Sequence, residues 1–241
     1  MQNRSTSSGD STPRAKSEDK IREGRILNAA AELFIHYGYD KTTVSDIARE
    51  AGVSKGAIYL HFESKDGLFE ALLVREMTTY AEKWIELLEA DPKGGTLGGM
   101  YKNSLYALSS SAFMAAMLKQ DSRVLGSYLR KPNNFFRRQQ EQGSRFVFVK
   151  MMQDAGAVRA ELDPQVTAHI MDMLAYGLVS MGDIKAKEDI PPTAAIIEGI
   201  ADIMDRALTP ADGGDSEAGK EIVRQVAAAA RQQLENSKDA D

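Results

Sequence analysis

Residues 42–62 read TTVSDIAREAGVSKGAIYLHF, and the capping and turn residues in this stretch indicate two short helices. Thr43 is followed three residues later by Asp46, which is typical of a capping box at the first turn of a helix. Gly52 then ends the helix, because glycine readily adopts the left-handed conformation of a C-terminal cap. The pattern predicts a short helix over residues 44–51.

A second short helix follows the glycine turn. Ser54 is a favourable N-cap, so we predict this helix over residues 55–61. Two short helices joined by a tight turn describe a helix-turn-helix, in which the second helix enters the major groove of DNA. The apolar residues spaced to form the small core of such a module are Ile47, Val53, Ile58 and Phe62.

Helices are also predicted on both sides of this module. Apolar residues recur at spacings of three and four between Lys20 and Gly38, and an apolar face follows over residues 65–90. Residues 146–149 have local β-propensity but fall inside a helical window, so we assign them to a buried helix. No stretch is a convincing strand, and the predicted fold class is all-α. The remaining helices are predicted at residues 100–118, 121–130, 133–155, 164–184, 192–208 and after a linker at 209–219.

Composition excludes several classes of protein. The 241 residues include no cysteine, which excludes disulfides, a thiolate nucleophile and cysteine zinc sites. A formal net charge of −5 argues against a chain that coats nucleic acid by bulk charge. Residues 1–20 lack the apolar core of a secretory signal, and no run of about 18 apolar residues follows. We therefore expect a soluble, cytoplasmic protein.

Residues 42–62, followed by Ser64 and Lys65, resemble the DNA-binding signature of the TetR (TetR/AcrR) family of bacterial transcriptional regulators. The resemblance implies an all-helical homodimer whose N-terminal domains bind a palindromic operator. It also implies that the C-terminal domains dimerise and bind a small-molecule effector, which releases the DNA. A repressor is the expectation from this resemblance, although the residues themselves leave repression and activation open.

The resemblance and the composition together divide the chain into four parts. The basic residues of the N-terminal part either contact DNA or belong to a solvated tail. The C-terminal helix either wraps a partner subunit or is a loosely attached end. The four parts are a flexible arm at 1–19, the helix-turn-helix DNA-binding domain at 20–65, a helical effector-binding and dimerisation domain at 66–208, and a linker with a C-terminal helix at 209–241.

Eight residues are candidates for contact with DNA when the family's pattern is carried over to this chain. Ser45 is expected near the edge of the groove, and Thr43 is expected to cap its helix beside a phosphate. Lys65 combines its charge with the N-terminal end of a long helix, which favours a phosphate. For each residue the alternative is a surface or capping role. The candidates are Thr43, Ser45, the base- or backbone-facing Lys55, Gly56 and Ala57, the phosphate-contacting Tyr59 and His61, and Lys65.

The C-terminal half suggests a dimer interface and a ligand pocket. Residues 164–184 and 192–208 have apolar faces with small residues, so pairing with their twofold copies would make a four-helix bundle. The alternative is that these faces pack inside one subunit. We expect the effector to be apolar or aromatic, because the candidate lining is soft and apolar. The candidate pocket residues are Trp84, Tyr106, Phe113, Met117, Phe148, Met151, His169 and Tyr176.

Two other functions compete with that of a DNA-binding regulator. An enzyme is disfavoured because no glycine-rich phosphate loop follows a strand, and because His36, His61 and His169 are not spaced as metal ligands on one helix face. We accordingly expect no metal, no cofactor and no catalytic residues. A helical adaptor that has lost DNA binding is the remaining alternative, and it would be indicated by a damaged recognition helix, whereas the helix at residues 55–61 is intact.

Overall fold

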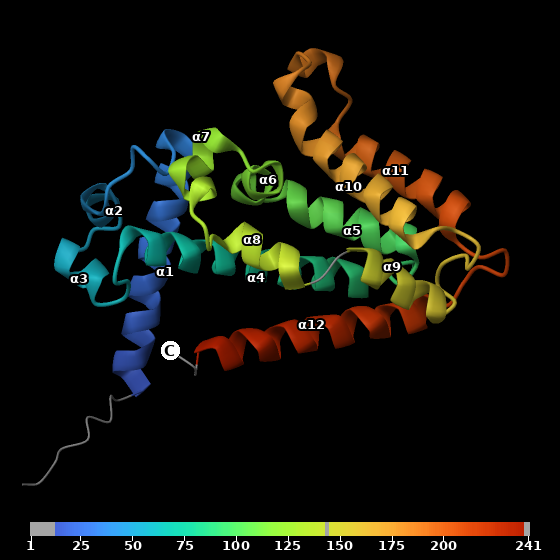
Figure 1. The fold of residues 1–241 in the computed structure, drawn as a ribbon, viewed down its shortest axis with the longest axis horizontal. Coiled ribbons are helices and arrows are strands. Elements are labelled where there is room, and N and C mark those ends of the chain that lie inside the picture. The colour runs from blue at the N-terminus through green and yellow to red at the C-terminus, as the bar shows by residue number, and fades with distance from the viewer. Residues whose placement is uncertain (1–12, 143–144, 239–241) are drawn as a thin grey trace, which may run out of the picture.

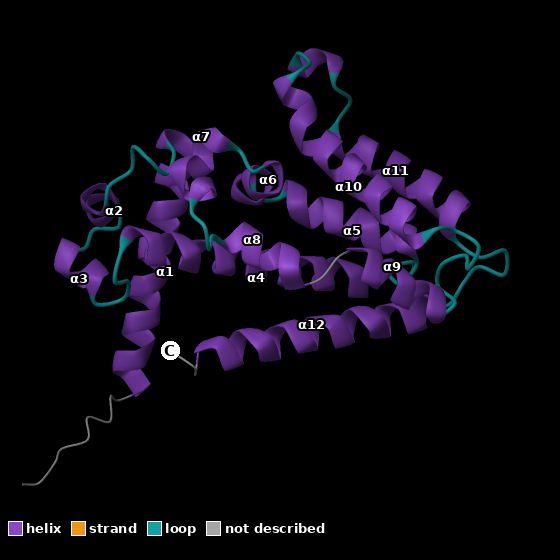
Figure 2. Cartoon of the chain, in the orientation of Figure 1, coloured by secondary structure: helices purple, strands orange, loops and turns teal. Residues whose placement is uncertain are grey.

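The computed structural model describes residues 13–142 and 145–238 of the chain. Within these residues the regular structure is entirely helical, and Figure 2 shows helices joined by loops. The predicted all-α class is therefore confirmed. Residues 146–149 are helical as expected, but Phe146 is 40% exposed and Val147 is 50% exposed, so this helix is not buried on all sides.

Three helices form the N-terminal end of the molecule. They are α1 (Pro13–Tyr37), α2 (Val44–Glu50) and α3 (Lys55–Tyr59). The helix α1 begins before the predicted Lys20, so the part of the predicted flexible arm at 13–19 is helical. Proline at the first position of a helix is favourable because it has the right backbone angle and lacks a donor that would be unpaired there. Residues 1–12 of the predicted arm lie outside the described residues.

The helix α4 (Lys65–Ala90) extends from the N-terminal module into the C-terminal half and has the bounds predicted from the sequence (Figure 1). Its first turn is capped by Ser64, whose hydroxyl accepts a hydrogen bond of 3.0 Å from the Gly67 amide. The helix α5 (Leu97–Ser109) packs along its second half. Trp84 fixes this contact by donating a hydrogen bond of 3.0 Å from Nε1 to the Met100 carbonyl.

The middle of the chain contains shorter and more numerous helices than the sequence predicted. The predicted helix 100–118 is two helices, because Ser111 starts a new one by accepting a hydrogen bond of 3.1 Å from the Met114 amide. The predicted helix 133–155 is likewise described as two helices. The elements here are α6 (Ala112–Lys119), α7 (Ser122–Leu125), the 3-10 helix η1 (Gly126–Arg130), α8 (Phe135–Gln142) and α9 (Arg145–Asp154).

The last helices form two layers on either side of the α4–α5 pair. In Figure 1, α10 and α11 rise together above α5, while α12 runs back along the molecule below α4. The helix α10 ends at Ser180, and two 3-10 turns lead from it to α11. The bounds are α10 (Pro164–Ser180), η2 (Met181–Asp183), η3 (Lys187–Asp189), α11 (Thr193–Leu208) and α12 (Ser216–Lys238).

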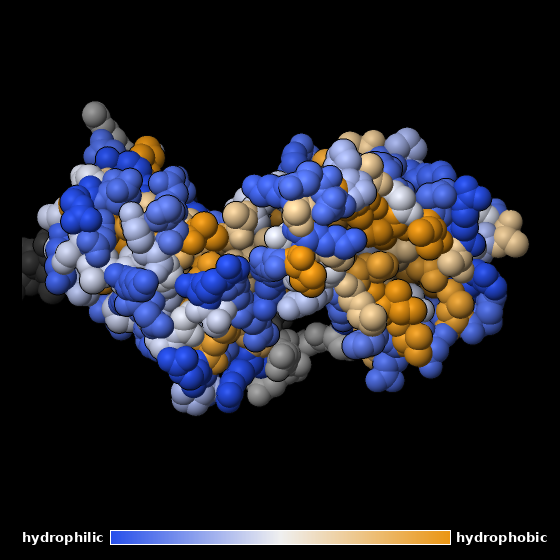
Figure 3. All heavy atoms as spheres, turned by 90° about the horizontal axis from the view of Figure 1, so that it is seen from above, coloured by the Kyte–Doolittle hydropathy of each residue, from blue (hydrophilic) through white to orange (hydrophobic). Residues whose placement is uncertain are grey.

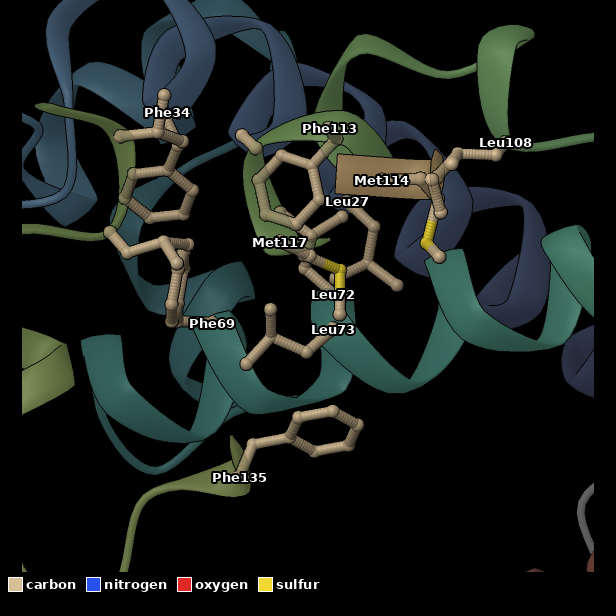
Figure 4. Close-up of a cluster of buried hydrophobic side chains, with 14 of the residues drawn as sticks. Leu27, Phe34, Phe69, Leu72, Leu73, Leu108, Phe113, Met114, Met117 and Phe135 are labelled. Atoms are coloured by element: carbon tan, nitrogen blue, oxygen red, sulfur yellow. The ribbon is translucent and has the colours of Figure 1, made fainter. Parts of the chain in front are cut away.

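An aromatic cluster joins the N-terminal module to the middle helices. The ring of Phe69 on α4 has centroid distances of 4.8 Å to Phe34, 4.9 Å to Tyr39 and 4.8 Å to Tyr128. Figure 4 shows that apolar side chains of α6 reach the same core, which α1 and α4 line. The N-terminal module therefore rests on η1 and α6 through a shared hydrophobic core.

Candidate nucleic-acid interface

The first turn of α2 is closed by a reciprocal pair of hydrogen bonds. The Thr43 hydroxyl oxygen accepts from the Asp46 amide at 3.2 Å, and the Asp46 carboxylate accepts from the Thr43 amide at 3.1 Å and from the Thr43 hydroxyl at 2.6 Å. The predicted capping box is confirmed. These bonds, first from the hydroxyl and then from the amide of Thr43, lower the pKa of the Asp46 carboxyl.

The turn between α2 and α3 depends on glycine. Gly52 has a φ of +64°, the left-handed conformation that was expected at this position. After it, the Val53 amide donates to the Ala48 carbonyl at 3.0 Å, and the Ser54 hydroxyl accepts from the Ala57 amide at 3.1 Å. The predicted small core is confirmed, since Ile47, Ile58 and Phe62 are buried and Val53 packs against them.

The outer surface of α3 carries two rows of side chains. Lys55 and Tyr59 form the first row, in which the lysine Nζ lies 6.0 Å from the centroid of the tyrosine ring. Gly56 begins the second row, and the only atom near its missing Cβ is the Ser54 hydroxyl at 3.8 Å. Thr43 and Ser45 on the preceding segment are also exposed, and Ala57 is half-buried. Six of the eight predicted residues thus have an exposed or half-buried place on the module.

The remaining two predicted residues are half-buried and lie against other parts of the protein. The side chain of His61 is only 8% exposed, and its Nε2 lies 3.4 Å from the Asp19 carboxylate on α1. The Lys65 ammonium donates a hydrogen bond of 2.5 Å to the Tyr39 carbonyl and lies 4.0 Å from the centroid of the Tyr39 ring. Burial lowers the pKa of Lys65. Both side chains therefore have contacts distant in sequence that the prediction did not include, and their contact with DNA stays a prediction.

Leu60 is a surface residue of this module that the sequence analysis did not select. It follows the last residue of α3 and is 83% exposed. The signal was present in the sequence, because Leu60 lies four residues after Gly56 and therefore falls on the same helix face.

Polar contacts tie the module to η1 and the loop after it. The Asp40 carboxylate accepts hydrogen bonds from the hydroxyl of Ser127 and from its amide, the latter at 3.0 Å from Oδ2, and the hydroxyl bond is the main cause of the lowered pKa of Asp40. Asp66 bonds to the Tyr39 hydroxyl and to the Lys131 ammonium. Burial and then the hydrogen bond to Asp66 raise the pKa of Tyr39. We call these five residues the junction.

The eight candidate pocket residues lie in several parts of the described structure. Phe113 and Met117 are buried in the core drawn in Figure 4. Trp84 and Phe148 contact each other, with ring centroids 6.4 Å apart, and Met151 is half-buried on the same helix as Phe148. The remaining three are Tyr106, which donates a hydrogen bond of 2.8 Å to Glu198, and His169 and Tyr176, which are exposed on α10.

Two pockets of the described surface lie beside the C-terminal helices. His169 lines a pocket of about 300 Å³ with Arg145 of α9 and Asp172 of α10. A pocket of about 610 Å³ near Arg159 and Arg206 includes none of the eight. The predicted lining is therefore divided between the core, the contact of α4 with α9, the contact of Tyr106 with α11, and the outer face of α10.

The outer faces of α10 and α11 are strongly apolar. Along α10, Val166, Ile170 and Met173 are 56%, 50% and 62% exposed, and Ile203 on α11 is 68% exposed. Figure 3 shows a broad hydrophobic area on the half of the molecule that carries these two helices. Two of the small residues in these helices leave room for a neighbour, since a Cβ added to Gly177 or Gly199 would meet no atom within 4 Å. We call this surface the α10–α11 face.

Two further kinds of feature are absent from the described ranges, 13–142 and 145–238. No helix there combines the length and apolarity needed to cross a bilayer. No cluster of three or more histidine, aspartate or glutamate side chains in those ranges has an arrangement that suits a metal ion.

Comparisons with known proteins agree with this geometry. Residues 26–72 match the family model described as bacterial regulatory proteins, tetR family. The chain is 29% identical over 189 residues to the HTH-type transcriptional repressor Rv1474c of Mycobacterium tuberculosis, a match that covers 76% of this chain and 93% of that protein. It is 25% identical over 189 residues to the regulator UidR of Escherichia coli K12, covering 77% and 92%.

The fold is also found among solved structures. The transcriptional regulator FadR of Bacillus subtilis, solved in complex with stearoyl-CoA, matches with a TM-score of 0.57 at 18% identity, over 75% of this chain and 96% of that one. This likeness concerns the fold, whereas the matched helix-turn-helix and the two curated relatives concern the family. Residues 26–72 thus carry the DNA-binding domain of the TetR family of bacterial regulatory proteins, and the chain is similar to HTH-type transcriptional regulators over about three quarters of its length.

Proposed function

We propose that this DNA-binding regulator acts as a homodimeric repressor of a palindromic operator and that a small-molecule effector releases it. The observation that carries the proposal is the outer surface of α3, where Lys55 and Tyr59 are exposed on a short helix held by a buried core. A cation, a phenol and a glycine suit a helix that must approach base edges and phosphates closely. A regulator of this kind acts on chromosomal DNA, which places it in the bacterial cytoplasm.

The α10–α11 face supports the dimer. Its exposed residues recur at spacings of three and four along α10, as they do on helices that pack against another helix. Exposed apolar areas of this kind mark interaction sites on soluble proteins. A twofold copy is the simplest occupant, because one face that packs on itself satisfies both subunits at once. Two modules then bind two half-sites, and the operator becomes a palindrome.

An apolar or aromatic effector is supported by the aromatic contact between α4 and α9. Trp84 and Phe148 meet there and are both only half-buried. Soft aromatic surface of this kind suits an apolar ligand. Of the eight candidate residues, these two and Met151 remain the best placed to contact it, since Phe113 and Met117 already fill the core beside α4.

The junction gives such an effector a route to the DNA-binding module. Asp40 belongs to the module and Asp66 to the first turn of α4 beside it, while Ser127 and Lys131 belong to the segment around η1. A shift of η1 relative to α4 would change these bonds and the aromatic contacts of Tyr128 together. Rigid helices with two alternative arrangements transmit binding energy in this way.

Selection of bound sequences from a random DNA pool tests the proposal, with the wild-type chain and Tyr59→Ala side by side. We expect enrichment of a palindrome with half-sites about one helical turn apart, 34–36 Å, and its loss in the variant. No enrichment at low or moderate salt would favour the helical adaptor instead. Release by effectors is then tested with a panel comprising a long-chain acyl-CoA, an apolar aromatic compound and a polar sugar as control, read by thermal stabilisation and by loss of operator binding.

A further inference from the structure

We propose that Leu60 reads thymine in each half-site of the operator, by contacting the 5-methyl group of the base with its isobutyl side chain. The proposal rests on the operator binding proposed above and adds the base that one residue of this chain would recognise. It concerns the second row on α3, which begins at Gly56.

The exposure of Leu60 is the first observation. At 83% it is the most exposed of the large apolar side chains in the described part of the chain, well above its neighbour Tyr59 at 47%. A single exposed leucine on a protein surface needs no explanation by itself. Leu60 differs from other exposed apolar residues because it lies at the end of the helix proposed to enter the DNA groove.

The second observation is the direction in which Leu60 leaves the helix. Its backbone is helical, with φ of −74° and ψ of −24°, and its amide donates a hydrogen bond of 3.2 Å to the Gly56 carbonyl. The helical path therefore continues through this residue. Since a helix turns by about 100° per residue, Leu60 lies about 160° around the axis from Ile58, the residue of α3 that is buried in the core.

The third observation is that Gly56 lies on the same outward face of α3 as Leu60. Gly56 lies one turn before Leu60 on the same face, about 40° away around the axis. Because Gly56 has no side chain, the helix backbone is free to approach the groove there. Leu60, one turn later on the same face, then also lies close to the groove. The polar row of Lys55 and Tyr59 lies to one side of this direction and is available for phosphates.

The chemistry of the groove then selects the partner. Leu60 has no donor or acceptor in its side chain, so it gains nothing from the nitrogen and oxygen atoms on base edges. The one apolar group that base pairs present in the major groove is the thymine 5-methyl group. Among base edges in the groove, that methyl group is the one against which the exposed leucine can bury apolar surface.

The experiment is a scan of the operator selected by the full-length wild-type chain. Each thymine is replaced in turn by deoxyuridine, which lacks only the methyl group, and affinity is measured by fluorescence anisotropy for the wild type, Leu60→Ala and Leu60→Met. We expect the wild type to lose about fourfold in affinity at one thymine per half-site, and about fifteenfold when both copies are replaced. Leu60→Ala should bind the unmodified operator with a similar loss and be insensitive to that replacement, while Leu60→Met keeps the sensitivity.

The control is Ile184→Ala, which removes a side chain of matched exposure, 80%, far along the chain from the module. Any effect of this variant on assembly changes affinity for both DNAs equally, so the thymine-to-deoxyuridine ratio should stay at the wild-type value. If the wild type shows no sensitive thymine, or if Leu60→Ala keeps the wild-type ratio, the assignment of Leu60 is wrong and operator binding stands. If the wild type selects no operator at all, the proposed function fails and this proposal fails with it.

Discussion

The carboxylate of Asp40 occupies the space beside Gly126 that a side chain at residue 126 would need, since a Cβ there would lie 2.6 Å from Oδ2. Gly126 also has a φ of +51°, which other residues adopt at a cost. One small residue on η1 thus allows the loop after α1 to bond to Ser127. This contact lies at the centre of the junction.

Gly126→Ala should lower the free energy of unfolding by about 2–3 kcal/mol, because the backbone strain adds to the displacement of Asp40. Thermal and urea unfolding measure the change. Gly156→Ala is the matched control, because Gly156 has a φ of +73° but no atom within 4 Å of the added Cβ. It should cost only about 1 kcal/mol for the strain itself. Equal costs for the two variants would mean that Asp40 moves aside freely.

Removing the cap of α2 should destabilise the module, and the effect should depend on pH. Thr43→Ala is expected to cost about 1 kcal/mol at neutral pH, while Thr43→Ser keeps the hydroxyl and serves as control. The pKa of Asp46 is lowered in the folded chain, so its contribution is present above the unfolded value and is lost as pH falls through the folded value. The difference between wild type and Thr43→Ala, measured by chemical unfolding, should therefore shrink toward acid pH. A constant difference contradicts the role of the carboxylate.

The first row on α3 should supply operator affinity. Lys55→Ala and Tyr59→Ala should each weaken binding by roughly 1–3 kcal/mol without unfolding the chain, because both side chains are exposed. If Lys55 contacts a phosphate, its loss should also reduce the salt dependence of binding by about one ion. Lys187→Ala, an exposed lysine on η3, is the control. Wild-type affinity in both α3 variants, with normal circular dichroism, would show that α3 is not the recognition helix.

A charge on the α10–α11 face should separate the subunits. Ile170→Glu and Met173→Glu place a carboxylate among apolar residues. The desolvation free energy of a carboxylate buried in the interface exceeds the free energy gained from dimerisation. Sedimentation velocity should show monomers that retain the helical spectrum. Ile21→Glu, at a residue of α1 that is 63% exposed, should leave the dimer intact. Unchanged sedimentation of the α10 variants would instead support packing of these faces without a partner.

The attachment of α12 should depend on the close approach of two glycines, Gly219 on α12 and Gly95 in the loop before α5. A Cβ on Gly219 would lie 2.0 Å from the Gly95 carbonyl oxygen, so Gly219→Leu should push α12 away from the loop before α5. Trypsin should then cut α12 at Lys220 and Arg224 faster than in the wild type, where Arg224 bonds to Glu89 at 2.7 Å. Gln225→Leu, at an exposed residue, should not change the cleavage rate. Deleting residues 210–241 then tests the dimer: unchanged dimer affinity excludes the idea that α12 wraps a partner.

Local signals explain what could be predicted from the sequence. The bounds of α4 were predicted because Ser64 starts the helix and Asp91 and Pro92 end it, and each of these effects acts within a few residues. The capping box of α2 and the left-handed Gly52 were predicted for the same reason. The break at Ser111 was missed because the apolar pattern runs through it, although the serine was a cap signal.

Contacts between distant residues explain what could not be predicted. Lys65 bonds to a carbonyl 26 residues earlier, and His61 lies against Asp19, so neither partner follows from periodicity or from the family's pattern. The same limit applies to the pocket. Phe113 and Met117 have the composition of a ligand lining, and only the packing of α6 on α4 shows that they are core residues.

The junction also decides where this protein is divisible. A chimera that joins the first 65 residues of this chain to the effector half of another regulator would leave Asp40 without its serine, and a graft in the other direction would leave Asp66 without the Tyr39 hydroxyl. A chimera that exchanges DNA and effector specificities must therefore transfer residues 126–131 together with the N-terminal part. The transferred unit is then made of two segments that are not contiguous in the gene.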